Sequence, residues 1–139
     1  MKIITDSLSF STSGFSDMHN ITDEIAQKLS SSSLKSGTVT VFVSGSTGGL
    51  TTIEYESGLV EDFEEFMDRV IPQNKTYHHD ARWGDGNGFS HIRSALLGPS
   101  LTVPFSEGRL SLGTWQQIVF VDFDNRSRSR TLVLQFIGE

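Results

Sequence analysis

Gln117-Ile118-Val119-Phe120-Val121-Asp122-Phe123 is the stretch around which the fold is built. Its apolar run is nearly continuous and rich in β-branched and aromatic residues, which is typical of a strand covered on both faces. Asp124-Asn125 then predicts a turn, and residues 130–137 predict a final strand. We expect these two strands to form an antiparallel hairpin at the centre of a sheet.

Further strands are predicted outward from this hairpin, over residues 1–10, 38–43, 50–55 and 101–105, by their β-branched and apolar content. The clearest helix precedes Pro72, because its apolar residues recur at helical spacing on one stripe. These residues are Leu59, Phe63, Phe66, Met67 and Val70. The acidic residues between them lie mostly off the stripe, and we interpret them as a solvated face rather than a metal site.

Two shorter helices are predicted from capping residues. Asn20 and Thr22 are expected to cap a helix that ends at the serine run over residues 30–33. Ser90 is expected to cap a helix over residues 91–97, which Gly98 and Pro99 close. Residues 1–139 therefore predict one α+β domain, a largely antiparallel sheet packed with about three helices. Because a small domain has little material to cover both faces of the 117–123 strand, we expect a second subunit to supply part of the cover.

Composition restricts the classes of function. The chain has 139 residues, a formal net charge of −6 and no cysteine. The acidic balance gives no reason to expect binding to nucleic acid or to an acidic membrane. Any metal must be held by His, Asp or Glu. With no long apolar run and no leader-like start, a cytoplasmic location is the simplest expectation.

A glycine-rich segment, Gly84-Asp85-Gly86-Asn87-Gly88, leads into the short helix that carries His91. Glycines allow positive φ and close approach of a ligand, and helix N-termini favour anions. The loop is expected to fold back and bring His79 towards His91, where Asp85 or Glu54 would complete an open site for a divalent metal such as Mg or Zn. An ordinary connection with surface histidines is the competing interpretation.

Two further segments have the chemistry to hold phosphate. Ser44-Gly45-Ser46-Thr47-Gly48-Gly49 offers hydroxyls and backbone N–H groups, although it lacks the lysine of a P-loop. Arg126, Arg128 and Arg130 alternate, so on a strand their guanidinium groups would point the same way and require anions. The anions are expected to be a diphosphate-bearing ligand or carboxylates of a neighbouring subunit.

Several motifs in this order resemble the YjbQ-like family, also called the secondary thiamine-phosphate synthase family. They are the glycine loop with Ser90-His91, the segment Gly108-Arg109-Leu110-Ser111-Leu112-Gly113-Thr114-Trp115-Gln116, the arginine turn and the closing Leu-Gln-Phe-Ile-Gly-Glu. The resemblance covers essentially the whole chain. It implies a homotrimer with a pocket near subunit interfaces, metal ions in some members, and weak synthesis of thiamine phosphate from a pyrimidine diphosphate and a thiazole phosphate.

The resemblance also implies site residues. His79 and His91 match family histidines and would hold the metal; Asp85, Gly86, Asn87 and Gly88 match the loop between them, and Glu54 matches a strand glutamate. The chemistry of the residues themselves adds Ser46, Thr47, Gln116 and the three arginines as candidates to bind phosphate or ligand, and Trp115 to stack on a heterocycle or anchor a subunit interface.

This chain departs from the family pattern in one loop. Many members carry His-Thr-Thr where this chain has Gly45-Ser46-Thr47. A third histidine ligand is then missing from that loop, so Asp, Glu or water must complete any metal site. Two functions follow: an enzyme with thiamine-phosphate synthase as a secondary activity, or a non-catalytic trimer that binds a metal ion or a phosphorylated or other anionic metabolite.

Overall fold

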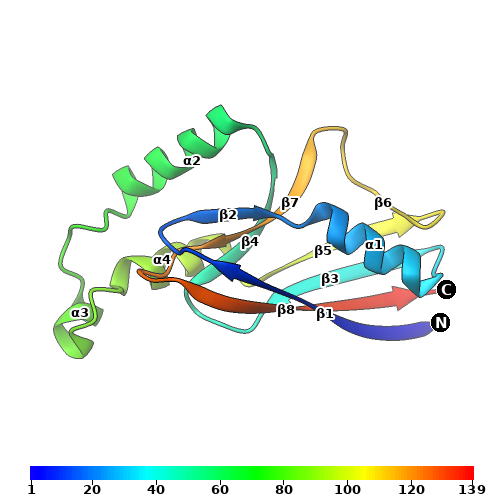
Figure 1. Ribbon diagram of the computed structural model, residues 1–139, viewed down its shortest axis with the longest axis horizontal. Coiled ribbons are helices and arrows are strands. Elements are labelled where there is room, and N and C mark those ends of the chain that lie inside the picture. Colours follow the sequence, from blue (N-terminus) through cyan, green and yellow to red (C-terminus); the bar gives the residue numbers. More distant parts are fainter.

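Two antiparallel β-sheets and four helices make up the structure, a computed structural model that describes residues 1–139 (Figure 1). The strands are β1 (Lys2–Thr12), β2 (Asp17–Asn20), β3 (Gly37–Val43), β4 (Gly48–Glu54), β5 (Ser100–Ser106), β6 (Arg109–Leu110), β7 (Gln116–Asp122) and β8 (Arg128–Gly138). The helices are α1 (Thr22–Ser32), α2 (Ser57–Val70), α3 (His78–Trp83) and α4 (Gly88–Leu97). The large sheet has the order β1-β8-β3-β5-β6 and the small sheet the order β2-β7-β4.

The expected hairpin between β7 and β8 is wrong, because the two strands belong to different sheets. β7 lies between β2 and β4 in the small sheet, and β8 lies between β1 and β3 in the large one. Residues 123–127 carry the chain from one sheet to the other. Arg128 and Arg130 of β8 donate hydrogen bonds to Asp124 and Asp122, at and just after the end of β7, so the crossing is held by side chains instead of a strand ladder.

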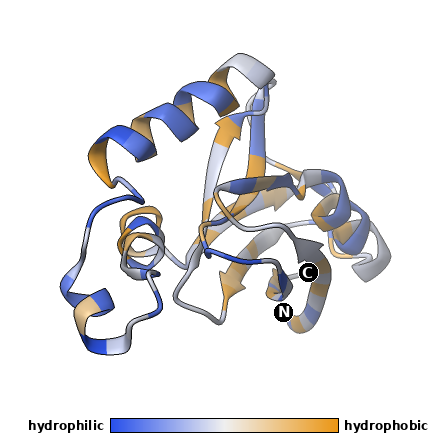
Figure 2. Cartoon of the chain, turned by 60° about the vertical axis from the view of Figure 1, so that its left-hand side comes forward, coloured by the Kyte–Doolittle hydropathy of each residue, from blue (hydrophilic) through white to orange (hydrophobic).

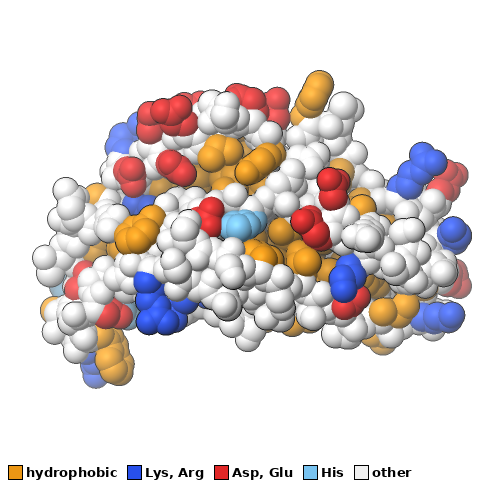
Figure 3. Space-filling model, in the orientation of Figure 1, with side chains coloured by type: hydrophobic (Ala, Val, Ile, Leu, Met, Phe, Trp, Pro, Cys, Tyr) orange, Lys and Arg blue, Asp and Glu red, His pale blue; other side chains and the backbone are white.

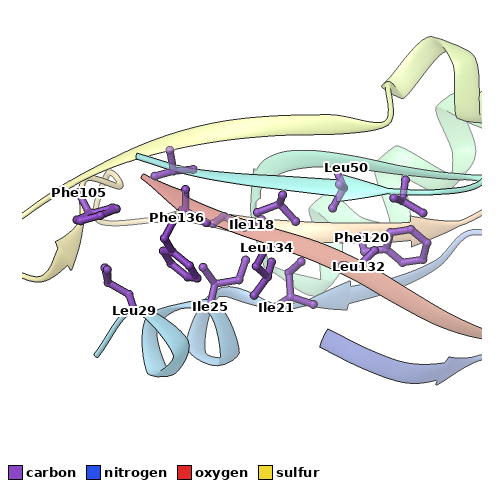
Figure 4. Close-up of a cluster of buried hydrophobic side chains, with 14 of the residues drawn as sticks. Ile21, Ile25, Leu29, Leu50, Phe105, Ile118, Phe120, Leu132, Leu134 and Phe136 are labelled. Carbon is purple, nitrogen blue, oxygen red and sulfur yellow. The ribbon is translucent and has the colours of Figure 1, made fainter. Parts of the chain in front are cut away.

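The main core lies between the two sheets and α1. Figure 4 shows Ile25 and Leu29 of α1 directed towards the strand side chains. Ile118 and Phe120 enter this core from one face of β7, and both are fully buried. Burial of such side chains is worth about 1.5–3 kcal/mol each, so this layer is what holds the sheets together.

The second core lies on the opposite face of the small sheet. Val119, Val121 and Phe123 point into it, together with Met67 of α2 and Phe89 of α4. The prediction that residues 117–123 are covered on both faces is therefore confirmed. The expected need for a second subunit to cover them is wrong, because the large sheet covers one face and the helices cover the other.

Helix α2 buries only part of its predicted apolar stripe and turns slightly to one side of it. Val60, Phe63 and Met67 turn towards the second core, whereas Phe66 is 44 % exposed and Val70 is 52 % exposed. The side chains at i, i+3 and i+7 face the core because Phe123 lies on this side of the helix. The rings of Phe123 and Phe63 stack with centroids 6.3 Å apart. The acidic residues of α2 are exposed as expected, along the upper edge of Figure 3. Figure 2 likewise shows α2 and the chain that follows it as largely hydrophilic, against hydrophobic strand segments at the centre.

The predicted helix starts are displaced by one to three residues, and one helix was missed. Ile21 is the N-cap of α1, while the Asn20 side chain accepts from the backbone N–H of Thr22 at 3.2 Å. Asn87, not Ser90, is the N-cap of α4, so Ser90 lies inside the first turn and donates to the Asn87 carbonyl at 2.8 Å. The additional helix, α3, is too short to show a period. No helix is both long and apolar enough to cross a membrane.

Candidate functional site

The glycine-rich segment folds back between α3 and α4 as expected. Gly84 and Gly86 adopt φ of +67° and +64°, values that side chains disfavour, and turn the chain. Gly88 is instead required for the close packing of α4 against Tyr77, because an added Cβ would lie 2.6 Å from Cβ of Tyr77. The backbone N–H of Gly88 donates to Asp80 Oδ1 at 2.8 Å, which ties the start of α4 to α3.

This turn places the rings of His79 and His91 with centroids 4.5 Å apart. Nδ1 of His79 lies 3.4 Å from Oδ1 of Asp85 and 3.8 Å from Oδ1 of Asp80. That nitrogen is buried and makes no hydrogen bond. Ligand atoms of His79, Asp80 and Asp85 all lie within 4.8 Å of one another, which is the spacing a shared cation would bridge. We call these three residues the cation cluster.

Asp80 is held in its ionised form. The backbone N–H of Gly88 lowers the pKa of Asp80 most, against the opposing effect of burial, and the N–H of Tyr77 and the His79 ring lower it further. Each carboxylate oxygen already accepts one backbone N–H and keeps a free lone pair. The donor set of the cluster, one imidazole and two carboxylates, fits a divalent cation with an open position.

His91 lies beside the cation cluster but is not a member of it. Its side chain lines a pocket of about 240 Å³ whose other walls are small residues: Gly45, Ser46, Ser94, Ala95 and Pro99. Nη1 of Arg130 lies 3.4 Å from the position of a Cβ on Gly45. An imidazole and a serine hydroxyl therefore border one small pocket, and the Arg130 guanidinium lies close to its Gly45 wall. We call it the His91 pocket.

Asp124, which is fully buried, joins the three candidate segments. It accepts from Asn87 of the glycine loop at 3.5 Å, from Thr47 of the small-residue loop at 2.9 Å and from Arg128 of β8 at 3.0 Å. Burial alone raises the pKa of Asp124, but the Thr47 hydrogen bond and the charges of Arg128 and Arg130 together lower it below its ordinary value. The segments that the sequence placed far apart thus meet at one carboxylate.

Two of the three arginines, Arg128 and Arg130, are neutralised by carboxylates of the same chain. Arg130 donates to Asp122 twice, at 2.6 and 2.9 Å, and also to Thr47. Arg128 pairs with Asp124 at 3.0 Å. Arg126 lies in the turn before β8, so the expectation that all three guanidinium groups share one strand face is wrong.

Three predicted site residues lie at the other end of the small sheet. Glu54 pairs with Gln116, six positions along the same ladder from the pair between Gly48 and Asp122. At about 3.3 Å per residue this is a separation of roughly 20 Å. Glu54 therefore does not complete the cation cluster within one chain. Trp115 is 71 % exposed in the turn next to it, and Gln116 hydrogen-bonds Thr52.

Sequence reasoning missed Asp80, Asp122 and Asp124 as site residues. Asp80 directly follows His79 and shares its helix, a neighbouring pair that signals metal chemistry only once the loop is known to fold back. Asp122 and Asp124 alternate, as do Arg128 and Arg130. Alternating acidic residues before a turn and alternating basic residues after it could have predicted these ion pairs.

Comparisons with known proteins match nearly the whole chain. The family described as UPF0047 protein YjbQ-like matches residues 6–139. A UPF0047 protein of Archaeoglobus fulgidus is 40 % identical over 114 residues, covering 82 % of this chain and 86 % of its own. A UPF0047 protein of Methanothermobacter thermautotrophicus is 36 % identical over 139 residues, covering 100 % of this chain and 95 % of its own. The crystal structure of a YbjQ-like protein of unknown function from Sulfolobus solfataricus superposes with a TM-score of 0.93 at 30 % identity, covering 99 % of each chain. Sequence and structure together establish that the chain belongs to the UPF0047 YjbQ-like family.

Proposed function

We propose that the protein binds a divalent metal ion through His79, Asp80 and Asp85 and holds a phosphorylated metabolite beside it. The observation that carries the proposal is the buried, unpaired Nδ1 of His79, which faces two carboxylate oxygens across distances too long for a good hydrogen bond. A buried polar atom without a partner costs about 1–3 kcal/mol, and a cation between these three atoms would remove that cost. The imidazole ligand favours Zn²⁺ over Mg²⁺.

The His91 pocket is the place for the phosphate. The backbone N–H groups of residues 44–47 have no backbone acceptor, and successive free N–H groups are a common anion-binding feature. Arg130 supplies a guanidinium at Gly45, and Ser46 supplies a hydroxyl. When bound, the metal would neutralise part of the charge on a phosphate held there.

The enzymatic form of this proposal is thiamine-phosphate synthesis, in which a pyrimidine diphosphate is joined to a thiazole phosphate and pyrophosphate leaves. It is favoured by the proximity of His79 to His91, because the cation cluster and the anion pocket then adjoin through two neighbouring, mutually tilted rings. His91 is placed to hold or transfer a proton at the leaving group. We further propose that the protein acts as a homotrimer.

Elemental analysis of the purified protein tests the metal. We expect one Zn²⁺ per chain in the wild type and loss of the metal in His79→Ala and in Asp85→Asn. His78→Ala is the matched control, because His78 neighbours His79 but is exposed and outside the cluster. No bound metal in the wild type, or equal metal in all four proteins, would refute the proposal.

Titration with pyrophosphate, with and without Zn²⁺, separates binding from catalysis. Binding that needs both Zn²⁺ and His91 supports the metabolite site, and binding that is unchanged in His91→Ala contradicts it. Formation of thiamine phosphate that is lost in His91→Ala supports the enzyme, whereas binding without product leaves a metal-dependent binding protein. Light scattering tests the trimer, which would have three times the 15.4 kDa mass of the chain.

A further inference from the structure

A second pocket lies at the far end of the small sheet, where β4 ends and β7 begins. Its volume is about 420 Å³, which is within the usual range for a small-molecule site. Trp115 and Tyr55 supply its aromatic surface, and Glu54 and Glu56 supply its charge. Figure 1 shows this end of β4 and β7 at the top of the molecule, away from α3 and α4.

The tryptophan is exposed yet held in place. Trp115 is 71 % exposed on a turn that the backbone of Gln116 closes by donating to the carbonyl of Gly113 at 3.1 Å. The Gln116 side chain also accepts from the N–H of Gly113 at 3.0 Å, so the turn is braced twice. Tyr55, 47 % exposed, reaches the carbonyl of Met18 with its hydroxyl. Two large aromatic side chains thus present apolar area to solvent, Trp115 from a braced turn and Tyr55 with its hydroxyl on the Met18 carbonyl.

The carboxylates in this pocket have no cation. Neither Glu54 nor Glu56 forms a salt bridge, and no lysine or arginine lines the pocket. Glu56 is held in orientation because it accepts from the backbone N–H of Gly58 at the start of α2. Beside it, Asn20 donates to Gln117 at 3.1 Å, so these two amides are occupied with each other.

From this combination we infer that the pocket binds an organic cation, of the class of quaternary ammonium compounds or N-alkylated heteroaromatic rings. Aromatic faces attract such cations through their negative quadrupole, and unpaired carboxylates add Coulomb attraction. A bare metal ion fits less well, because no three ligand atoms here lie close enough together to form a coordinating group. A phosphate would be repelled by the two glutamates.

This site is independent of the metal site proposed above. The pocket lies at the opposite end of β4 and β7 from the pair between Gly48 and Asp122, roughly 20 Å along the strands. It shares no residue with the cation cluster or with the His91 pocket. Loss of metal in His79→Ala should therefore leave cation binding intact. Failure of either proposal can be recognised without reference to the other.

Choline and its uncharged carbon isostere, 3,3-dimethyl-1-butanol, are the probes that test the inference. The protein contains two tryptophans, Trp83 and Trp115, so the indole N–H resonances of ¹⁵N-labelled protein report on each one separately. We expect choline to shift the Trp115 resonance saturably and to leave the Trp83 resonance in place. The isostere should bind on the order of tenfold more weakly, since it fills the same volume without the charge.

Matched variants complete the test. Glu54→Gln should weaken choline binding several-fold, and Trp115→Ala should abolish it as measured by saturation transfer to the choline methyl groups. Trp83→Ala is the control, because Trp83 is equally exposed, at 70 %, but lies at the end of α3. Equal binding of choline and its isostere, an unchanged affinity in Glu54→Gln, or an equal loss in Trp83→Ala would each overturn the inference.

Discussion

Asp122→Asn should be among the most damaging single-atom changes in this protein. Asp122 is fully buried and receives two hydrogen bonds from Arg130, at 2.6 and 2.9 Å, and one from Thr12 at 2.6 Å. The Arg130 side chain is only 12 % exposed, so it has little access to water when its partner is lost. Asparagine keeps the volume and one acceptor oxygen, but it turns an N–H₂ group towards a guanidinium that needs an acceptor.

The expected loss follows from that burial. Breaking a buried ion pair by changing one partner costs about 3–5 kcal/mol, and the more distant Asp124, 3.8 Å from Arg130, places the loss near the lower end of this range. A domain of this kind is stable by roughly 5–15 kcal/mol, so the variant should still fold but with a large part of its stability gone.

Urea unfolding followed by circular dichroism measures the effect, with all proteins at one concentration because an oligomer would make stability concentration-dependent. Asp6→Asn is the matched control. Asp6 pairs with Lys28 at 3.1 Å, but the two side chains are 40 % and 36 % exposed, so the loss should be far smaller than that in Asp122→Asn. Equal losses in the two variants would refute the reasoning that burial makes the Asp122 pair indispensable.

Three further predictions concern acid stability, the glycine loop and the packing of α2. Because folding lowers the pKa of Asp124, its carboxylate adds to the stability of the fold above its unfolded pKa near 4, and this added stability is lost as pH falls through the folded pKa. Urea midpoints should therefore drop below about pH 4, and less steeply in Asp124→Asn. Gly88→Ala should destabilise by about 1–3 kcal/mol, since its Cβ would overlap Tyr77, and a thermal melt equal to that of the wild type would contradict the contact. Met67→Ala should cost about 2–5 kcal/mol and Phe66→Ala less than about 1 kcal/mol in urea unfolding; the reverse order would mean that α2 packs on its other face.

Much of the candidate site could be predicted from the sequence, but only as separate segments. The glycine loop predicted the contact of His79 with His91, because positive-φ glycines turn the chain within a few residues. The serine-rich loop and the arginine segment were both identified as polar elements with unmet charge or hydrogen-bonding capacity. Their common partner, Asp124, was not identified, since its role depends on bringing three distant segments together.

The local pattern of residues determined where strands and helices form and which strand is buried on both faces. Periodicity, β-branching and capping act over a few neighbours, so β7 and the span of α2 were predictable from the chain itself. Only the tertiary structure decided the partners: β7 and β8 enter different sheets, α2 leaves Phe66 and Val70 exposed, and Asp124 and Asp122 pair with Arg128 and Arg130. The sheet partners and the buried face of α2 depend on residues far apart in the sequence or on competition between alternative faces. The ion pairs join residues only four and eight positions apart, but they form because the chain crosses between the two sheets there. Their free energies are set by burial and contact in the folded state, which no local pattern records.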